Sequence, residues 1–335
     1  MNMMGSDSYD LTITSSFTQR SEGVIKQAAA DFRVDEELGF LPSGEGEHVF
    51  VQLQNSGDNT AYLQAQLAKF AGIPARSVSY SGLKDRHAIT TQWFGLHLPG
   101  KKSLQWDELC LNNTRVIQAE RHNKKLRIGA HKSNAFDILV RCDEQQAQTA
   151  SDNLEQVLAR GFPNYFGLQR FGHNGSNLIS KPRNKNQRSL QISAARSFLF
   201  NALVSTKVAD GSWLNLEAGD VVQLNGVQSI FTIEEVDSII QRRLDEGDIH
   251  PSALLCGDDL SSVQIEELAI IEQFPSLLEI IEKAQVKSSR RATRANAKNL
   301  QWNIEKEGLR LKFSLGTGSY ATALIGDVFD LGETS

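Results

Sequence analysis

The sequence predicts an α+β protein in which one module interrupts another. Strand and helix patterns alternate between residues 47 and 140, the composition changes near Gly161, and strand alternation returns after Asn296. Because this last strand needs a sheet to join, we expect it to complete the first module. We therefore predict a first module of residues 1–160 and 297–335, with a mixed and mainly antiparallel sheet, and an inserted module of residues 161–296.

A strand and an amphipathic helix open the first module. Val49, Val51 and Leu53 alternate at period two. Apolar residues at helical spacing follow the cap candidates Asn59 and Thr60, and Gly72 and Pro74 are expected to end that helix. The same patterns predict further strands at residues 78–80, 92–98, 115–120 and 136–141, and a helix at 147–160 that Gly161 stops.

The inserted module begins with an aromatic and glycine-rich stretch at residues 162–172. An amphipathic helix around Leu199, a hairpin turned at Asn225-Gly226 and two helices divided by Pro275 are predicted after it. Beyond the insertion, residues 309–315 alternate as a strand, and we expect Ser319 to cap a last helix that runs to Val328.

Composition excludes several classes of protein. The chain has 335 residues, a net charge of −5 and three cysteines, Cys110, Cys142 and Cys256, which are far apart and predict free thiols rather than a disulfide framework or a zinc site. No apolar run approaches the roughly 20 residues of a membrane span, and residues 1–20 are polar. We expect a soluble, cytoplasmic protein with no membrane association; the oligomeric state stays open, with a monomer slightly favoured.

Cofactor and metal motifs are missing from the sequence. Neither G-x-G-x-x-G nor G-x-x-x-x-G-K-[ST] occurs, and the seven histidines show no H-x-x-x-H or H-E-x-x-H spacing. We therefore expect no cofactor and no metal.

Basic residues gather in three windows that contain no acid. The windows are residues 121–132, residues 181–188 and residues 287–298, the last of which includes Arg290, Arg291 and Arg294. Each could be an ordinary solvated surface, but three such windows in an acidic chain indicate a segregated surface for a polyanion.

The segment 81–90 contains the candidate reactive centre. Asp85 lies between Lys84 and Arg86, beside a glycine that lets the backbone turn, and predicted strands flank the segment. Neighbouring cations hold a carboxylate ionised, and an ionised oxygen can act as a nucleophile. The alternative is a solvated turn, since Lys-Asp-Arg triplets are common on surfaces.

Two other positions have both a functional and a structural interpretation. Arg170 lies among aromatic residues and could contact a phosphate, while core packing accounts for the rings of Phe162, Tyr165 and Phe166. Asn134 could donate to and accept from a base edge, although an Asn before a strand is more often a turn residue.

Ordered motifs along almost the whole chain resemble the TruD family of tRNA pseudouridine synthases. The matching segments are residues 24–26, 30–34, 44–48, 82–90, 125–129, 134–136, 163–167, 170–172, 193–197 and 318–322. The resemblance implies a pseudouridine synthase catalytic domain interrupted by an α/β TRUD domain, and tRNA as the partner.

The resemblance also implies roles for individual residues. Asp85 is the expected nucleophile, and Phe32 and Asn134 are expected to contact the target uridine. Tyr320 stands where the family usually has a phenylalanine beside the base. Lys26 is a candidate cation near the carboxylate or the extruded nucleotide, a role that Lys84 and Arg86 could fill instead. The implied reaction isomerises a tRNA uridine, at position 13 in family members, and needs no cofactor.

Two other functions are compatible with parts of the sequence. A non-catalytic RNA-binding or chaperone-like module would use the basic windows and leave Asp85 idle. A glycoside hydrolase with two carboxylates is motivated by Asp31, Asp35, Glu36 and Glu37, although clustered acids of this kind are usually solvated turns.

Overall fold

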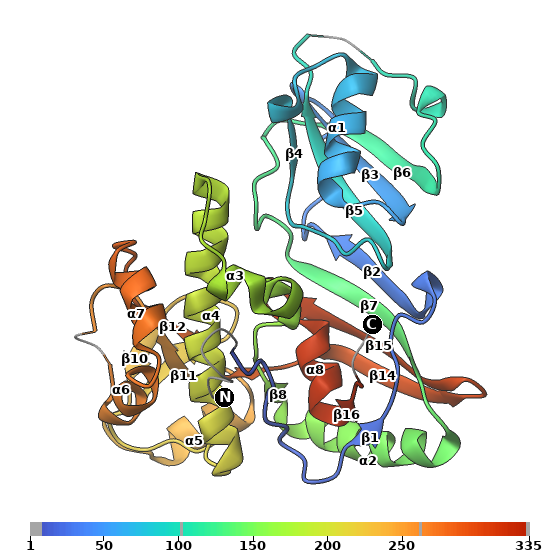
Figure 1. Ribbon diagram of the computed structural model, residues 1–335. Helices are drawn as coiled ribbons and strands as arrows, with labels where there is room; N and C mark the ends of the chain where they lie inside the picture. Colours follow the sequence, from blue (N-terminus) through green and yellow to red (C-terminus); the bar gives the residue numbers. More distant parts are fainter. Residues whose placement is uncertain (1–8, 101–102, 261–262, 333–335) are drawn as a thin grey trace. The chain divides into compact units, whose positions relative to one another are not determined.

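The chain folds into two compact units, each assembled from separate segments. The computed structural model describes residues 9–100, 103–260 and 263–332 (Figure 1). One unit comprises Met1–Ser21, Thr149–Asn296 and Ser319–Asp330, and the other comprises Glu22–Gln148, Ala297–Gly318 and Leu331–Ser335. These are packing units, and the predicted domain division at residues 160 and 296 stays a prediction. Within the described ranges, no helix is both long and apolar enough to cross a bilayer.

The unit that contains Glu22–Gln148, called the second unit below, is built around an eight-stranded sheet. Its order is β14 (Lys298–Glu305), β15 (Gly308–Gly316), β7 (Ser133–Arg141), β2 (Phe32–Glu37), β5 (Ile89–His97), β3 (His48–Ser56) and β6 (Thr114–His122), with β4 (Val78–Tyr80) also paired to β5. Only the pairing of β2 with β5 is parallel. The prediction of an α+β fold with a mixed, mainly antiparallel sheet is confirmed, and β15 joins β7 as expected for the last strand.

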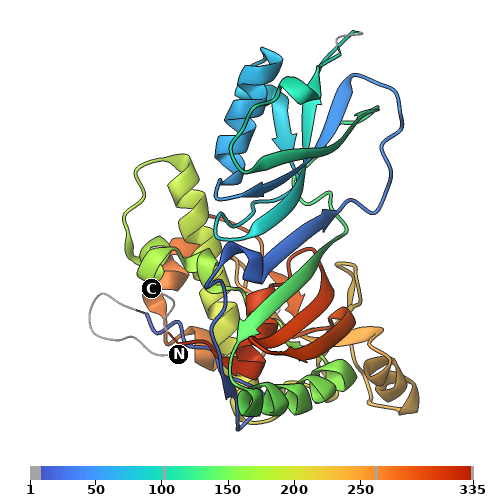
Figure 2. The ribbon, with the colours of Figure 1, turned by 90° about the vertical axis from the view of Figure 1, so that its right-hand side faces the viewer.

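Helix α1 (Thr60–Ala71) covers one face of this sheet (Figure 2). The Asn59 side chain accepts a hydrogen bond from the Tyr62 amide at 2.8 Å, and Gly72 ends the helix with a φ of 64°. Leu63 and Leu67 pack against alternate residues of β3, including Val51. Both predicted ends of this helix are confirmed.

Strand β2 lies in the middle of the sheet and was not predicted. It pairs with β5 on one side and with β7 on the other. Its sequence offers only two apolar residues, Phe32 and Val34, in phase with a third buried side chain, Glu36. Strand patterns based on apolar alternation miss a central strand whose buried face includes a carboxylate.

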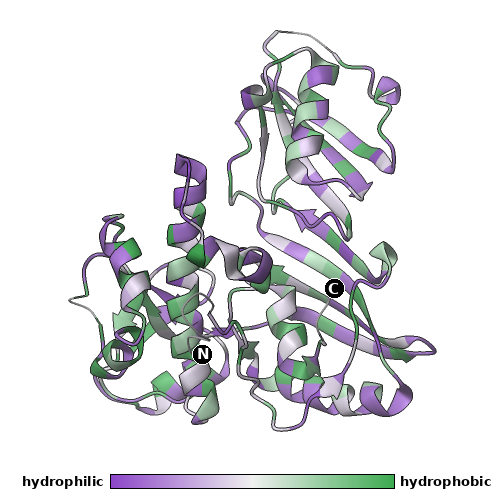
Figure 3. Cartoon of the chain, viewed as in Figure 1, coloured by the Kyte–Doolittle hydropathy of each residue, from purple (hydrophilic) through white to green (hydrophobic). Residues whose placement is uncertain are grey.

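Helix α4 (Lys185–Ala209) is the longest element of the first unit. Asn184 caps it, its first turns are hydrophilic and exposed, and its later turns bury apolar residues such as Phe198 and Leu203 (Figure 3). It contacts β11 (Ile249–Leu255) of a second sheet, whose order is β10 (Ile230–Thr232), β9 (Val221–Leu224), β11 and β12 (Ser289–Ala292). The predicted hairpin at Asn225-Gly226 is confirmed as β9 and β10.

The remaining elements are short apart from α2. The helices are α2 (Glu144–Arg160), α3 (Ser176–Ile179), α5 (Ser238–Asp245), α6 (Ile265–Ile271), α7 (Pro275–Glu282) and α8 (Ala321–Val328). The remaining strands are β1 (Ser21–Glu22), β8 (Phe162–Pro163), β13 (Arg294–Ala295) and β16 (Phe329–Asp330).

Pro275 is the first residue of α7, which confirms the predicted division of two helices. The predicted cap of α8 is wrong: Tyr320 occupies the cap position, and the Ser319 hydroxyl instead donates to Asn164 Oδ1 at 3.4 Å.

Candidate active site

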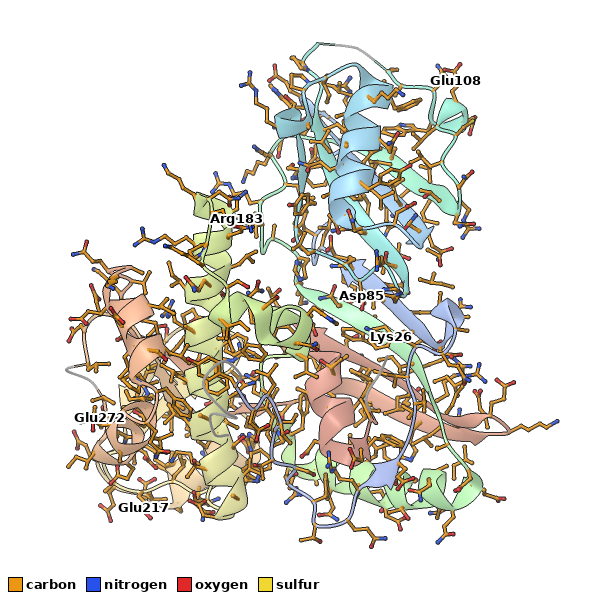
Figure 4. The ribbon with its side chains drawn as sticks, viewed as in Figure 1. Lys26, Asp85, Glu108, Arg183, Glu217 and Glu272 are labelled. Carbon is orange, nitrogen blue, oxygen red and sulfur yellow. The ribbon has the colours of Figure 1, made fainter. Side chains whose placement is uncertain are left out.

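Asp85 lies on the loop that joins β4 to β5, as the flanking strand patterns predicted. Lys26 and Asp85 lie near each other (Figure 4), and the Lys26 ammonium donates to Asp85 Oδ2. The His87 amide donates to Asp85 Oδ1 at 2.9 Å. The Asp85 side chain is 39% exposed, so the carboxylate is both held and accessible. Burial by itself raises the pKa of Asp85, but the hydrogen bonds from Lys26 and His87 outweigh it and keep the pKa below its ordinary value.

Lys26 reaches Asp85 from an unusual backbone conformation. Its φ is 58°, in the left-handed region that residues other than glycine seldom adopt. Its ammonium also lies 4.6 Å from the centre of the Phe32 ring, within the range of a cation–π contact. Lys26 therefore links Asp85 to Phe32, which is 5% exposed and packs edge-on against Phe136.

In the part of the chain that the structure describes, the two cations next to Asp85 in the sequence contact other groups and not its carboxylate. Lys84 donates instead to Glu36 Oε2 at 2.5 Å, and its side chain is 8% exposed. Arg86 is exposed and donates to His87 Nε2 at 2.9 Å. The expectation that these neighbours hold Asp85 ionised is therefore wrong, because Lys84 is bound to Glu36 and Arg86 to His87, and Lys26 is the cation that contacts the carboxylate.

Asn134 lies on β7 directly opposite Glu36 of β2. Its Oδ1 atom is buried and has no hydrogen-bond partner in the part of the chain that the structure describes. A buried acceptor without a donor costs free energy, so this oxygen is suited to a donor supplied by a ligand.

The side chains of Arg170 and Tyr320 meet in the first unit. Arg170 donates to the Tyr320 hydroxyl at 2.5 Å and to Ser193 Oγ at 3.1 Å. Its guanidinium also lies 5.5 Å from the centre of the Phe166 ring. The hydroxyl that distinguishes Tyr320 from phenylalanine is thus satisfied by a neighbouring cation. The aromatic residues Phe162, Tyr165 and Phe166 are buried, as their packing interpretation expected.

Two of the three basic windows are exposed. In the first, Lys124, Lys125 and Arg127 are exposed. In the second, Lys181 and Arg183 line an open groove of about 760 Å³ together with polar side chains of α3 and α4.

In the third basic window Arg290 and Arg294 are buried and Arg291 is partly buried, so the prediction that these arginines form a phosphate-binding surface is wrong; Lys287 and Lys298, at the two ends of the window, are exposed. Arg290 is 6% exposed and pairs with Glu267 at 2.7 Å. Arg294 is 6% exposed and donates to His250 Nδ1 at 2.9 Å. Arg291 lies over the Phe166 ring, 4.2 Å from its centre. Burial lowers the pKa of Arg291 to about 10.

Sequence reasoning missed a buried polar network behind the Asp85 loop. It placed Glu36 only in the glycoside hydrolase alternative and gave the side chains of Thr60, Ser81, Gln92 and His131 no role in the site, although each of the five residues is less than 9% exposed. The one available signal was the alternation of β2, which places Glu36 in phase with Phe32 and Val34.

The acids that motivated a glycoside hydrolase do not form a facing pair. Asp31 accepts two hydrogen bonds from Arg141, at 2.8 and 2.9 Å, and Glu36 is paired with Lys84. Asp35 and Glu37 are exposed at positions that alternate with Glu36. Among the described residues, histidine, cysteine and acidic side chains also do not gather in any group of three that could hold a metal ion.

Comparisons with known proteins agree with the resemblance seen in the sequence. The family model for tRNA pseudouridine synthase D (TruD) matches residues 10–181 and 182–328. A protein named tRNA pseudouridine synthase D from Pseudoalteromonas atlantica is 38% identical over 328 residues, which cover 93% of each chain. One of the same name from Actinobacillus succinogenes is 40% identical over 313 residues, covering 90% of this chain and 93% of the other.

The fold also matches a solved structure. The crystal structure of a putative tRNA pseudouridine synthase D (TruD) from Methanosarcina mazei aligns with a TM-score of 0.68 at 20% identity, covering 94% of this chain and 95% of that chain.

Proposed function

This chain belongs to the TruD family of tRNA pseudouridine synthases, and we propose that it isomerises a uridine of tRNA, at position 13, to pseudouridine in the cytoplasm. The observation that carries the proposal is the Asp85 carboxylate, which Lys26 and the His87 amide keep ionised on an accessible loop. The reaction breaks the bond from C1′ to N1, turns the base, and joins C1′ to C5, while a proton leaves C5 and N1 gains one.

Asp85 is the nucleophile in this proposal. Its carboxylate either attacks C1′, adds to C6 of the base, or promotes departure of the base as a bound anion; all three routes need it ionised. Lys26 keeps the carboxylate ionised and stabilises negative charge that develops beside it. No atom is exchanged with a cofactor and no net oxidation occurs.

Recognition of the target requires extrusion of the nucleotide, because its reactive atoms are buried in folded RNA. The unpartnered Asn134 Oδ1 can accept a hydrogen bond from the N3–H group of uracil. Phe32 and Tyr320 are the aromatic residues proposed to contact the base. The exposed cations of residues 121–132 and 181–188 supply phosphate contacts for tRNA, and Arg170 is proposed as another.

Replacement of the nucleophile tests the proposal. In Asp85→Asn we expect tRNA affinity to stay within about tenfold of wild type while turnover stops, because the phosphate-binding cations are untouched. Release of tritium from tRNA labelled at uridine C5 measures turnover, and carbodiimide mapping locates the product. Wild-type turnover in Asp85→Asn would defeat the assignment.

A non-catalytic RNA-binding module is the second candidate, and the exposed basic windows are the observation that favours it. The same mapping separates the two functions. A new pseudouridine stop after incubation with the wild-type protein supports the enzyme, whereas tight binding without any stop supports the module.

A further inference from the structure

Glu36 is a buried carboxylate at the centre of the sheet, one strand away from the Asp85 loop. Its side chain is completely buried, and it shares a face of β2 with Phe32 and Val34. A charge at such a position persists only where specific partners compensate it. Lys84 Nζ donates to Oε2 at 2.5 Å, and the Trp93 amide donates to Oε1 at 3.3 Å.

The backbone of the residues before Asp85 is fixed as well. The Lys84 amide donates to Thr60 Oγ1 at 3.0 Å, and the Gln92 side chain donates to the Gly82 carbonyl. Ser81 Oγ is 2.6 Å from His131 Nδ1 and accepts from the His131 amide at 2.8 Å. The loop is therefore tied to β2, β5, α1 and the segment before β7 up to the residue that precedes Asp85.

The His131 ring and the Lys84 ammonium both lie close to this turn. A Cβ atom added at Gly82 would lie 3.4 Å from the His131 ring and 3.7 Å from Lys84 Nζ. The ammonium group of Lys84 thus packs directly under the turn. Beyond Asp85, the Arg86 carbonyl accepts a hydrogen bond from the Gly57 amide at 3.2 Å, while the side chains of Arg86 and His87 are exposed and bond to each other.

We propose that Glu36 and Lys84 are positioning residues for the reaction: their buried ion pair holds the turn from Ser81 to Lys84 so that the Asp85 carboxylate meets Lys26. The inference rests on the proposed function and assigns no contact with substrate to either residue. A carboxylate that must meet a small target gains rate from such preorganisation, because a displacement of about 1 Å can cost about a hundredfold.

The double variant Glu36→Gln/Lys84→Met tests the proposal. It removes both charges together, so the net charge near Asp85 is unchanged, and a buried pair replaced as a whole is often tolerated by the fold. We expect kcat to fall at least tenfold with the Kd for tRNA within threefold of wild type. We also expect the acid limb of the single-turnover pH profile to move to higher pH, because Asp85 loses its contact with Lys26.

The chain offers a matched control in its other unit. Glu267 and Arg290 form a buried pair of the same design, in which Glu267 Oε1 also accepts from a backbone amide, that of Leu254, at 2.9 Å. Glu267→Gln/Arg290→Met should retain the wild-type kcat and acid limb in its folded fraction. An equal loss of kcat in this control would show a general effect of losing a buried pair and overturn the proposal.

Wild-type kcat and an unmoved acid limb in folded Glu36→Gln/Lys84→Met would also overturn it. If that variant does not fold, Lys84→Gln is measured in its place; it keeps a donor toward Glu36, and we expect at least a threefold loss of kcat with the same shift of the acid limb. Wild-type kinetics there would overturn the proposal. Failure of the wild-type protein to form pseudouridine would instead defeat the proposed function.

Discussion

The cation that holds Asp85 ionised is distant in sequence and close in space. Lys26 lies 59 positions earlier and contacts the carboxylate, whereas the adjacent Arg86 bonds to His87. Because the Asp85 side chain is partly exposed, the contact with Lys26 keeps the carboxylate ionised without removing it from solvent. The position of the ammonium, rather than the number of neighbouring cations, decides how readily Asp85 takes up a proton.

Removal of this ammonium should therefore shift the pH dependence of turnover. Lys26 lowers the pKa of Asp85, so in Lys26→Met the pKa should rise. We expect the acid limb of the single-turnover rate to move to higher pH, and the rate at neutral pH to fall at least tenfold because negative charge that develops beside the carboxylate is no longer stabilised. Quenched-flow measurement of tritium release, from the acid limb of the wild-type protein up to pH 8, records both.

Arg86→Met is the matched control for this variant, because it removes a cation next to Asp85 in sequence that does not contact the carboxylate in the described structure. Its acid limb should coincide with that of wild type. Equal shifts in the two variants would contradict the assignment of Lys26.

The tyrosine at position 320 illustrates how one atom changes the requirements of a site. A phenolic hydroxyl that is partly withdrawn from water needs a partner. Arg170 supplies it at 2.5 Å and is itself held by Ser193. The ring can thus keep the contact proposed for the base while Arg170 satisfies its hydroxyl.

The arginines of residues 290–294 show how a charged segment becomes part of a core. Strand β12 pairs with β11, and the Arg290 guanidinium binds Glu267 of α6 and the carbonyl of Ser252. Its charge is compensated inside the unit. The segment therefore holds β11, β12 and α6 together and does not offer a surface to phosphates.

Truncation of Arg290 should consequently affect stability rather than RNA binding. Arg290→Ala leaves Glu267 buried without its cation, which typically costs about 3–5 kcal/mol. We expect the urea midpoint to fall accordingly while the Kd for tRNA of the folded protein stays within twofold of wild type. Equilibrium unfolding and fluorescence anisotropy measure the two quantities.

Lys185→Ala provides the opposite case, because Lys185 is exposed in the first turn of α4. Its unfolding curve should match wild type, and its salt dependence of tRNA binding should weaken. Weaker tRNA binding by folded Arg290→Ala would restore the surface interpretation.

Elements with strong periodicity could be predicted from the sequence. Strand β3, helix α1 with its Asn59 cap, and the apolar face of α4 all follow local patterns. Strand β2 and the buried position of β12 could not, because an acid or arginine becomes buried only when a distant partner compensates its charge.

The same division applies to the candidate site. Asp85 and its loop are visible as a motif, and the position of Lys26 was proposed from a resemblance. The ion pair of Lys84 with Glu36 joins residues 48 positions apart and depends on the pairing of β2 with β5. No local pattern predicts such a contact, since it arises only from the complete sheet.

For the molecule as a whole, His250 should make stability depend on pH. It lies on β11, is 4% exposed, and accepts a hydrogen bond from Arg294 through Nδ1, so it is neutral in the folded protein. Burial and the nearby Arg294 charge lower its pKa to about 4. In the unfolded chain the pKa is about 6.5.

The sign of the effect follows from these two values. Above pH 6.5 neither state binds the proton, and the contribution to stability is complete. As pH falls from 6.5 toward 4, His250 takes up a proton in the unfolded chain but stays neutral in the folded protein. The free energy of unfolding therefore decreases, by about 3 kcal/mol over this interval.

His250→Gln isolates this contribution, because glutamine retains an acceptor for Arg294 and does not titrate. Between pH 7 and pH 4, the free energy of unfolding of wild type should fall by about 3 kcal/mol more than that of the variant. Urea titrations at unit pH intervals, followed by circular dichroism, provide the comparison. Parallel pH dependences for the two proteins would mean that His250 takes up its proton equally in both states, against the burial that the structure gives it.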